Sequence, residues 1–202
     1  MHHYVTLLLE SLRLLFDRSR LSSEQFQLQF IGEVPESIPA LPDYTFLAGR
    51  GAIDNANAHL PRAEARQRMA NADFLLLVDF YRDGGPSLQL PAKIFDYLPV
   101  GRPILAITTP DSPMHHVLGI SGIPHQVLFA SETAAERAEK IERLLTLPAG
   151  PHALSERYRA DFDGREQTAQ LAGWMDRLLR NTRTTDSLRA GAACALPRKR
   201  SS

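Results

Sequence analysis

Segments of helical periodicity alternate with short apolar runs along the first part of the chain. Near the N-terminus, apolar residues recur at the spacing of a helix with one buried face, at positions 5, 8, 9, 12, 15 and 16. The β-rich runs 26–31 and 44–48 are followed by glycines and predict two strands. A helix with a proline in its first turn is expected over 61–70. The continuous apolar run 74–78 predicts a strand buried on both faces.

The same alternation continues to about residue 145. The pattern predicts helices over 92–98, 114–118 and 132–145, the last capped by Ser131, and strands over 103–107 and 126–129. Apolar strands that alternate with helices are typical of a parallel sheet covered by helices on both faces. We therefore predict an α/β fold of the doubly wound, Rossmann-like kind.

Two further helices are expected over 153–160 and 165–180, and the second carries an apolar face that we expect to pack on the sheet. Beyond Asn181 the apolar periodicity stops, and five basic residues accompany one acid. The sequence thus predicts one domain over 1–181 and a loose basic tail over 182–202.

Charge and cysteine content exclude several classes of protein. The 23 basic residues balance the 23 acidic ones, so the chain lacks the positive field of a dedicated nucleic-acid binder. The single cysteine, Cys194, excludes an intramolecular disulfide and a thiolate metal cluster, which fits a cytoplasmic location. No apolar run approaches the ~20 residues of a membrane-spanning helix.

In open α/β sheets, ligands bind beyond the carboxyl ends of the strands, so the loops at these ends carry the candidate chemistry. Several are rich in small residues that let a backbone approach a phosphate, at Gly32-Glu33, Gly49, Gly84-Gly85 and Thr108-Thr109. For each of these loops taken alone, ordinary turn chemistry is the simpler explanation.

The helix expected over 92–98 is more informative. Pro91 and Lys93 stand at its start, and a helix N-terminus with a cation beside it suits a diphosphate. Lys93 and Asp96 are three residues apart and share a helix face, so they can address an anion and a hydroxyl pair of one ligand. The alternative is an exposed ion pair between the two side chains.

The segment LPAKIFDYLPVGRPILAI, residues 90–107, resembles the nucleotide-sugar-binding segment of retaining glycosyltransferases with the GT-B fold, the class that builds bacterial polysaccharides. Such enzymes carry a helix of this type followed by Gly-(Arg/Lys)-Pro and a buried strand. The flanking elements follow in the same order, so the resemblance covers most of residues 5–181. It implies the C-terminal, donor-binding domain of such an enzyme.

The resemblance also implies residue roles. Asp96 matches the family's acidic clamp on the donor ribose, although Asp is one methylene shorter than the usual Glu. Lys93 would neutralise the diphosphate of a UDP or GDP sugar without a metal or other cofactor, and the base would lie near residues 47–49. The expected catalytic residues are Lys93 and Asp96, and the expected donor-binding residues are Gly32, Glu33, Leu47, Ala48, Gly49, Gly84, Gly85, Pro91, Lys93 and Asp96.

The chain departs from the family pattern in two ways. Leu88 stands where many relatives carry a second acidic residue near the donor sugar. In addition, the sequence starts at the first helix of the donor domain, so we expect the opening strand and its Gly-rich loop to be missing and one sheet edge to be open. A separate acceptor domain or chain would then be needed for transfer. The expected acceptors, saccharides or lipid-linked saccharides, are compatible with peripheral membrane association.

Other functions stay open at this point. The chief alternative is a noncatalytic nucleotide or nucleotide-sugar module, or an inactive remnant of such an enzyme; an epimerase of the GT-B fold or a signalling domain comes third. A classical dehydrogenase is excluded because Gly49-Arg50-Gly51 lacks the third glycine and follows the wrong element. His115 and His116 offer a phosphate contact, and a solvated helix start is the simpler explanation.

Overall fold

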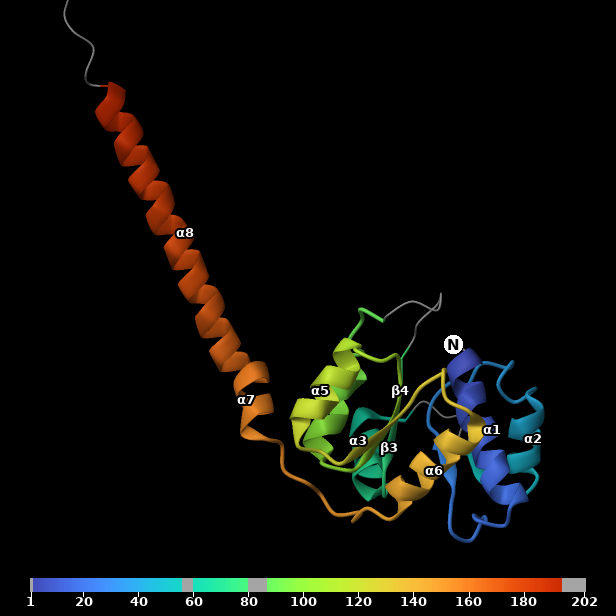
Figure 1. The fold of residues 1–202 in the computed structure, drawn as a ribbon. Helices are drawn as coiled ribbons and strands as arrows, with labels where there is room; N and C mark the ends of the chain where they lie inside the picture. The colour runs from blue at the N-terminus through green and yellow to red at the C-terminus, as the bar shows by residue number, and fades with distance from the viewer. Residues whose placement is uncertain (1, 56–59, 80–86, 194–202) are drawn as a thin grey trace, which may run out of the picture. The chain divides into compact units, whose positions relative to one another are not determined.

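The computed structural model describes residues 2–55, 60–79 and 87–193, with only the backbone given for 2–3 and 181–193 (Figure 1). Gly84 and Gly85, two of the predicted donor-binding residues, lie outside the described residues. The chain divides into two compact units, Met1–Tyr158 and Arg159–Ser202. The sequence analysis had placed one domain over 1–181.

The first unit contains two parallel sheets. Strands β1 (Leu28–Phe30) and β2 (Ile53–Asn55) form one, and β3 (Leu75–Val78), β4 (Ile104–Ile107) and β5 (His125–Leu128) form the other in that order. Its helices are α1 (His2–Asp17), α2 (Pro42–Ala48), α3 (Arg62–Asn71), α4 (Lys93–Tyr97), the 3-10 helix η1 (Leu98–Val100), α5 (Pro113–Ser121), α6 (Ala134–Leu145) and the start of α7 (Glu156–Phe162). The predicted mixed α/β architecture with parallel strands is confirmed.

Helices cover both faces of the three-stranded sheet. Figure 1 shows α5 on one side of β3 and β4, and α1, α2 and α6 on the other. On the α1 side, Leu105, Ile107 and Leu128 pack into one apolar core with the buried leucines of α1. Every residue of β4 is buried, which explains the continuously apolar sequence of this strand.

Buried Arg137 joins α6 to α1. Its guanidinium donates to Ser11 Oγ at 3.1 Å and to Glu10 Oε2 at 2.7 Å, and it also bonds the carbonyl of Glu132. The side chain is only 3% exposed. Because a buried charge is costly unless it is paired, these bonds fix the packing of the two helices.

The start of α6 is a capping box, two residues after the predicted cap at Ser131. Thr133 accepts from the backbone N–H of Glu136, and the Glu136 carboxylate accepts from the backbone N–H and hydroxyl of Thr133. These bonds, the backbone one first, lower the pKa of Glu136. The prediction at Ser131 was wrong because Thr-x-x-Glu satisfies two N–H groups at once, whereas Ser131 offers a single acceptor.

The predicted strand over 44–48 is wrong, because these residues form α2. Pro42 stands in the first turn, where its fixed φ favours a helix, and Asp43 suits the helix dipole there. The aromatic residues of this run favour strands locally, and the burial of Tyr44 and Leu47 in the α1 core decides for the helix. The strand of this region is β2. Its sequence does not indicate a strand, because Asp and Asn are uncommon in strands.

The second unit consists of the rest of α7 and the long helix α8 (Gly164–Ala193). The loose tail predicted over 182–202 stays a prediction: the backbone is helical as far as Ala193, and residues 194–202 lie outside the described part of the chain. Residues here have no strong helix breaker before Gly191, so the helix continues without an apolar face. The apolar side chains predicted to be packed are each more than half exposed: Leu171, Trp174, Met175, Leu178 and Leu179.

Two glycines allow the segment that follows α6 to pack closely against the ends of η1 and α5. Gly101 and Gly122 have φ of 76° and 80°, and each ends a helix. A Cβ at Gly101 would lie 2.6 Å from the carbonyl oxygen of His152, and one at Gly122 would lie 2.9 Å from the backbone nitrogen of Ser155. Both positions therefore require glycine for conformation and for space.

Arg137→Ala should lower the free energy of unfolding by about 2–3 kcal/mol, because it removes three hydrogen bonds at a buried position. Arg20→Ala is the matched control: Arg20 pairs with Glu142 of α6 at 2.8 Å but is 57% exposed, so its loss should cost about 1 kcal/mol or less. Urea unfolding measures both. Equal losses would show that burial of Arg137 adds nothing.

Gly101→Ala should cost more than about 1 kcal/mol, because alanine disfavours positive φ and its methyl group meets the His152 backbone. Gly150→Ala is the control, since a Cβ there meets nothing within 4 Å. Thermal unfolding of the two variants checks this. A stability of Gly101→Ala equal to that of Gly150→Ala would contradict the close packing.

Candidate functional site

The register of β3 and β4 brings two polar residues together where these strands end. Val78 lies opposite Ile107, so the next residues, Asp79 and Thr108, are also neighbours. The backbone N–H of Asp79 donates to Ile107 O at 2.9 Å, which extends the pairing past the strand. Ligands of parallel α/β sheets bind at this carboxyl edge, so these side chains occupy the expected place.

Buried hydrogen bonds connect the polar side chains at this edge. Thr108 Oγ1 lies 2.8 Å from both Asp79 Oδ2 and Ser112 Oγ. Because a hydroxyl has one hydrogen and a carboxylate can only accept, Thr108 donates to Asp79 and receives from Ser112. Ser112 Oγ also accepts from the backbone N–H of His115 at 3.1 Å and caps α5. The cap therefore holds the start of α5 against the ends of the strands.

Ser87 completes what we call the strand-end cluster: Asp79, Ser87, Thr108, Thr109 and Ser112. The backbone N–H of Ser87 donates to Thr109 Oγ1 at 3.0 Å. Asp79 and Ser87 are each 1% exposed. Nevertheless, Asp79 Oδ1 and Ser87 Oγ have no hydrogen-bond partner among the described residues.

Unpartnered buried oxygens are rare because each costs about 1–3 kcal/mol. Asp79 Oδ1 is an acceptor for a ligand hydroxyl or N–H, and Ser87 Oγ can both donate and accept. The two together suit a polar, uncharged part of a ligand, such as the hydroxyls of a sugar or ribose. Asp79 itself disfavours a phosphate in direct contact with it, because two negative charges would meet.

Lys93 and Asp96 of α4, to which the resemblance assigns roles, lie at the surface. Lys93, the first residue of the helix, is exposed, and Asp96 is 51% exposed and 3.8 Å from Arg62. Such a long, exposed ion pair contributes little stability, so the carboxylate of Asp96 stays accessible to a ligand. Neighbouring Tyr97 has a raised pKa, first because burial penalises its charged form and second because Asp96 repels that form. Pro91 lies just before the helix.

The remaining predicted donor-binding residues are not all suited to their role. Gly32 and Glu33 follow β1 as expected, and Gly32 has a φ of 108° that favours glycine. Leu47 is buried in the core, and its carbonyl accepts from Arg50 and Ala52.

The predicted base contact at 47–49 stays a prediction, but its structural premise was wrong, because these residues end α2 instead of following a strand. The N–H of Gly49 donates to Thr45 O at 2.9 Å, and the carbonyl of Ala48 accepts from Gly51 at 2.9 Å. Together with the two bonds to the Leu47 carbonyl, these contacts are those of a helix end. They occupy the backbone groups that were expected to meet the base.

Sequence reasoning indicated the loops at Asp79 and Thr108 but did not select Asp79, Ser87 or Ser112 as site residues. The sequence does indicate Asp79, because a polar residue directly follows each of two continuously apolar strands. Ser87 had no comparable signal, because its burial depends on the hydrogen bond to Thr109.

Among the residues whose side chains are described, 4–55, 60–79 and 87–180, no three His, Cys, Asp or Glu side chains are grouped closely enough to hold a metal ion. None of the described helices combines the length and apolar character needed to cross a bilayer.

Comparisons with protein-family models, curated proteins and solved structures find no match for this chain. The strand-end cluster is therefore interpreted from its own chemistry and from the resemblance of residues 90–107.

Proposed function

We propose that the first unit binds a nucleoside-diphosphate sugar, with UDP or GDP as the nucleotide, at the strand-end cluster and the adjacent start of α4. In this proposal the unit is the donor-binding half of a retaining glycosyltransferase with the GT-B fold, a doubly wound domain. The acceptor, a saccharide or a lipid-linked saccharide, would be held by a separate domain or chain.

The buried oxygens Asp79 Oδ1 and Ser87 Oγ, which have no hydrogen-bond partner among the described residues, carry the proposal. They lie at the carboxyl edge of a parallel sheet, where α/β proteins bind nucleotides. Leaving them unpaired costs stability, and a hydroxyl-rich ligand offsets that cost when it binds. A sugar or ribose supplies such hydroxyls, whereas an apolar ligand would leave both oxygens unpaired.

Lys93 is assigned to the diphosphate. Its exposed ammonium stands at the first position of α4, a short distance along the chain from Ser87. Negative charge develops on the diphosphate as the bond to the sugar breaks, and a fixed cation stabilises it. Asp96, one helical turn along, would accept hydrogen bonds from the ribose hydroxyls.

A noncatalytic binding module is the second candidate, and Leu88 favours it. This residue is 84% exposed and lies directly after buried Ser87. An apolar side chain there cannot polarise the donor sugar. If the chain binds a nucleotide sugar but supports no glycosyl transfer, the strand-end cluster is a binding site and the assignment to a glycosyltransferase fails.

Calorimetric titration with UDP, GDP and their sugar conjugates tests the binding site. We expect micromolar to millimolar dissociation constants, weakened about tenfold by Lys93→Ala because a charge-assisted contact is lost. Asp79→Asn should weaken binding of the sugar conjugates. Two controls should bind like the wild type: Arg66→Ala, an exposed cation of α3, and Asp73→Asn, which precedes β3 at its opposite end. Absence of binding by the folded chain would refute the proposal.

Asp79→Asn should also raise the free energy of unfolding, by about 1 kcal/mol, because a neutral amide of the same shape is less costly to bury than a half-paired carboxylate. Urea unfolding of the ligand-free chain measures the change. A loss of stability comparable to that of a broken buried network would instead identify Asp79 as a structural residue.

A further inference from the structure

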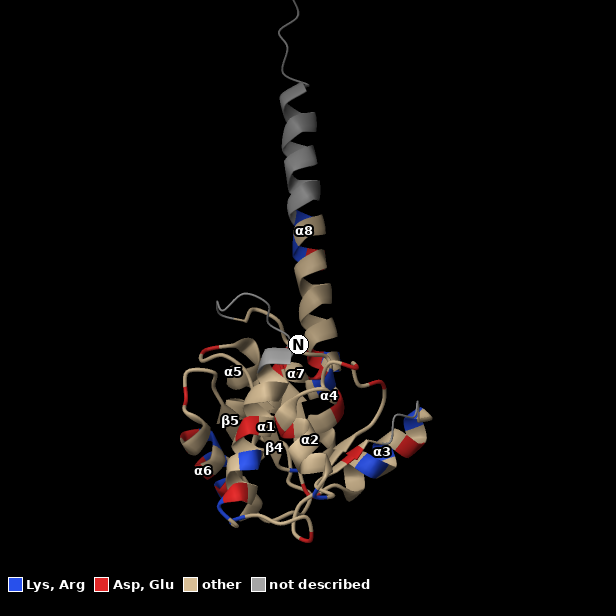
Figure 2. Cartoon of the chain, turned by 90° about the vertical axis from the view of Figure 1, so that its right-hand side faces the viewer, with Lys and Arg blue, Asp and Glu red and all other residues tan. Residues whose placement is uncertain are grey.

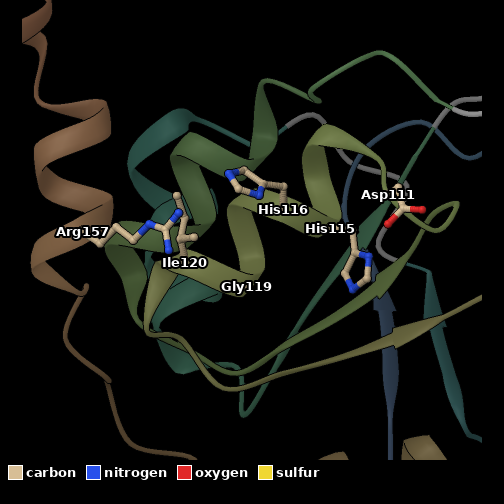
Figure 3. A pocket seen from close by; sticks show the side chains of 6 residues that line it. All are labelled: Asp111, His115, His116, Gly119, Ile120 and Arg157. Atoms are coloured by element: carbon tan, nitrogen blue, oxygen red, sulfur yellow. The ribbon is translucent and has the colours of Figure 1, made fainter.

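A hollow lies along the outer side of α5. Its volume is about 540 Å³, within the range of small-molecule sites. We call it the α5–α7 pocket; it is lined by Asp111, His115, His116, Gly119, Ile120 and Arg157. Figure 3 shows Arg157 reaching from α7 toward α5, where the His116 ring extends.

The position of Arg157 is fixed by backbone contacts at the end of α5. The N–H of Ser155 donates to Ser121 O at 2.8 Å, and the hydroxyl of Ser155 bonds the carbonyl of Ile120. The same hydroxyl accepts from the N–H of Tyr158 at 3.0 Å, which holds the first turn of α7. A Cβ at Gly122 would meet the Ser155 nitrogen at 2.9 Å, so the glycine allows Ser155 to pack this closely. These contacts hold the backbone at Arg157 beside α5.

Arg157 and His116 have no side-chain partner among the described residues, although both line the pocket. His116 and Ile120 are one helical turn apart, so the imidazole lies on the face of α5 that Arg157 approaches. Guanidinium and imidazole N–H groups are both donors, and the guanidinium is always charged. This end of the pocket therefore offers donors and positive charge to an anion.

The acidic group of the pocket lies at its other end. Asp111 precedes α5, whereas Ile120 lies near the end of this nine-residue helix, roughly 13 Å away along the axis. His115 is close to the start as well, where its ring contacts Phe129 edge-on with centroids 5.5 Å apart. In Figure 3, Asp111 and His115 lie on the side away from Arg157. The charge of Asp111 thus lies at the end of the pocket away from Arg157.

We propose that the α5–α7 pocket binds a phosphate group through Arg157 and His116, with the remainder of the ligand lying over Gly119 and Ile120. A planar guanidinium matches two phosphate oxygens at once. Gly119 leaves the floor open, because a Cβ there meets nothing within 4 Å. This site needs no nucleotide at the strand-end cluster.

Titration of the isotope-labelled chain with inorganic phosphate, followed residue by residue by NMR, tests this assignment. We expect saturable shifts at His116, Gly119 and Arg157. Arg157→Gln should weaken binding about tenfold, the loss of one charge-assisted contact. His116→Asn should weaken it by a smaller factor. Gly119→Leu should block the pocket without disturbing α5, because leucine is a better helix former than glycine.

The matched controls are Arg159→Gln, an exposed arginine of α7 that does not line the pocket, and Gly150→Leu, whose side chain also enters open space. Both should bind phosphate like the wild type. Unsaturable shifts in the wild type, or wild-type affinity in either Arg157→Gln or Gly119→Leu, would overturn the proposal. Shifts that saturate only at α4 and disappear in Lys93→Ala would place the phosphate at the nucleotide site and would also overturn it.

Discussion

The parallel register of β3 and β4 determines where the polar groups of the candidate site lie. Each strand is apolar up to its last residue, and each is followed at once by a polar residue. Because Val78 and Ile107 are partners, Asp79 and Thr108 meet at the carboxyl edge. A slip by one residue would place Asp79 beside Ile107 or Thr109 and would separate it from Thr108.

Helices on both sides hold this register. On one side, the leucines of α1 fill the core, and Arg137 ties that helix to α6. On the other side, Ser112 caps α5 and links it to Thr108. The segment after α6 is anchored at Gly101 and Gly122, which positions the first turn of α7. The same contacts that stabilise the fold thus place the side chains of the strand-end cluster and of the α5–α7 pocket.

Sequence patterns predicted the elements whose local preference agrees with their burial. The all-apolar β3 and β4 and the amphipathic α1 and α6 are of this kind. In the aromatic run of α2 and in the polar strand β2, local preference and the observed structure disagree. For α2, the tertiary contacts of Tyr44 and Leu47 outweigh the local preference. The location of the candidate site, at the carboxyl ends of parallel strands, could be predicted from the sequence. The hydrogen bonds of Asp79 and Ser87 could not, because their partners lie far along the chain. The roles of Lys93 and Asp96 stay predictions.

We propose that Asp79 Oδ1 and Ser87 Oγ, which have no partner among the described residues, form part of a sugar-nucleotide site. A crystal structure of the chain soaked with a UDP or GDP sugar tests it most directly. The account predicts a sugar or ribose hydroxyl within hydrogen-bond distance of Asp79 Oδ1, and the diphosphate beside Lys93. Density elsewhere with both oxygens still unpaired, or bonds from Asp79 Oδ1 and Ser87 Oγ to the chain itself, would contradict it.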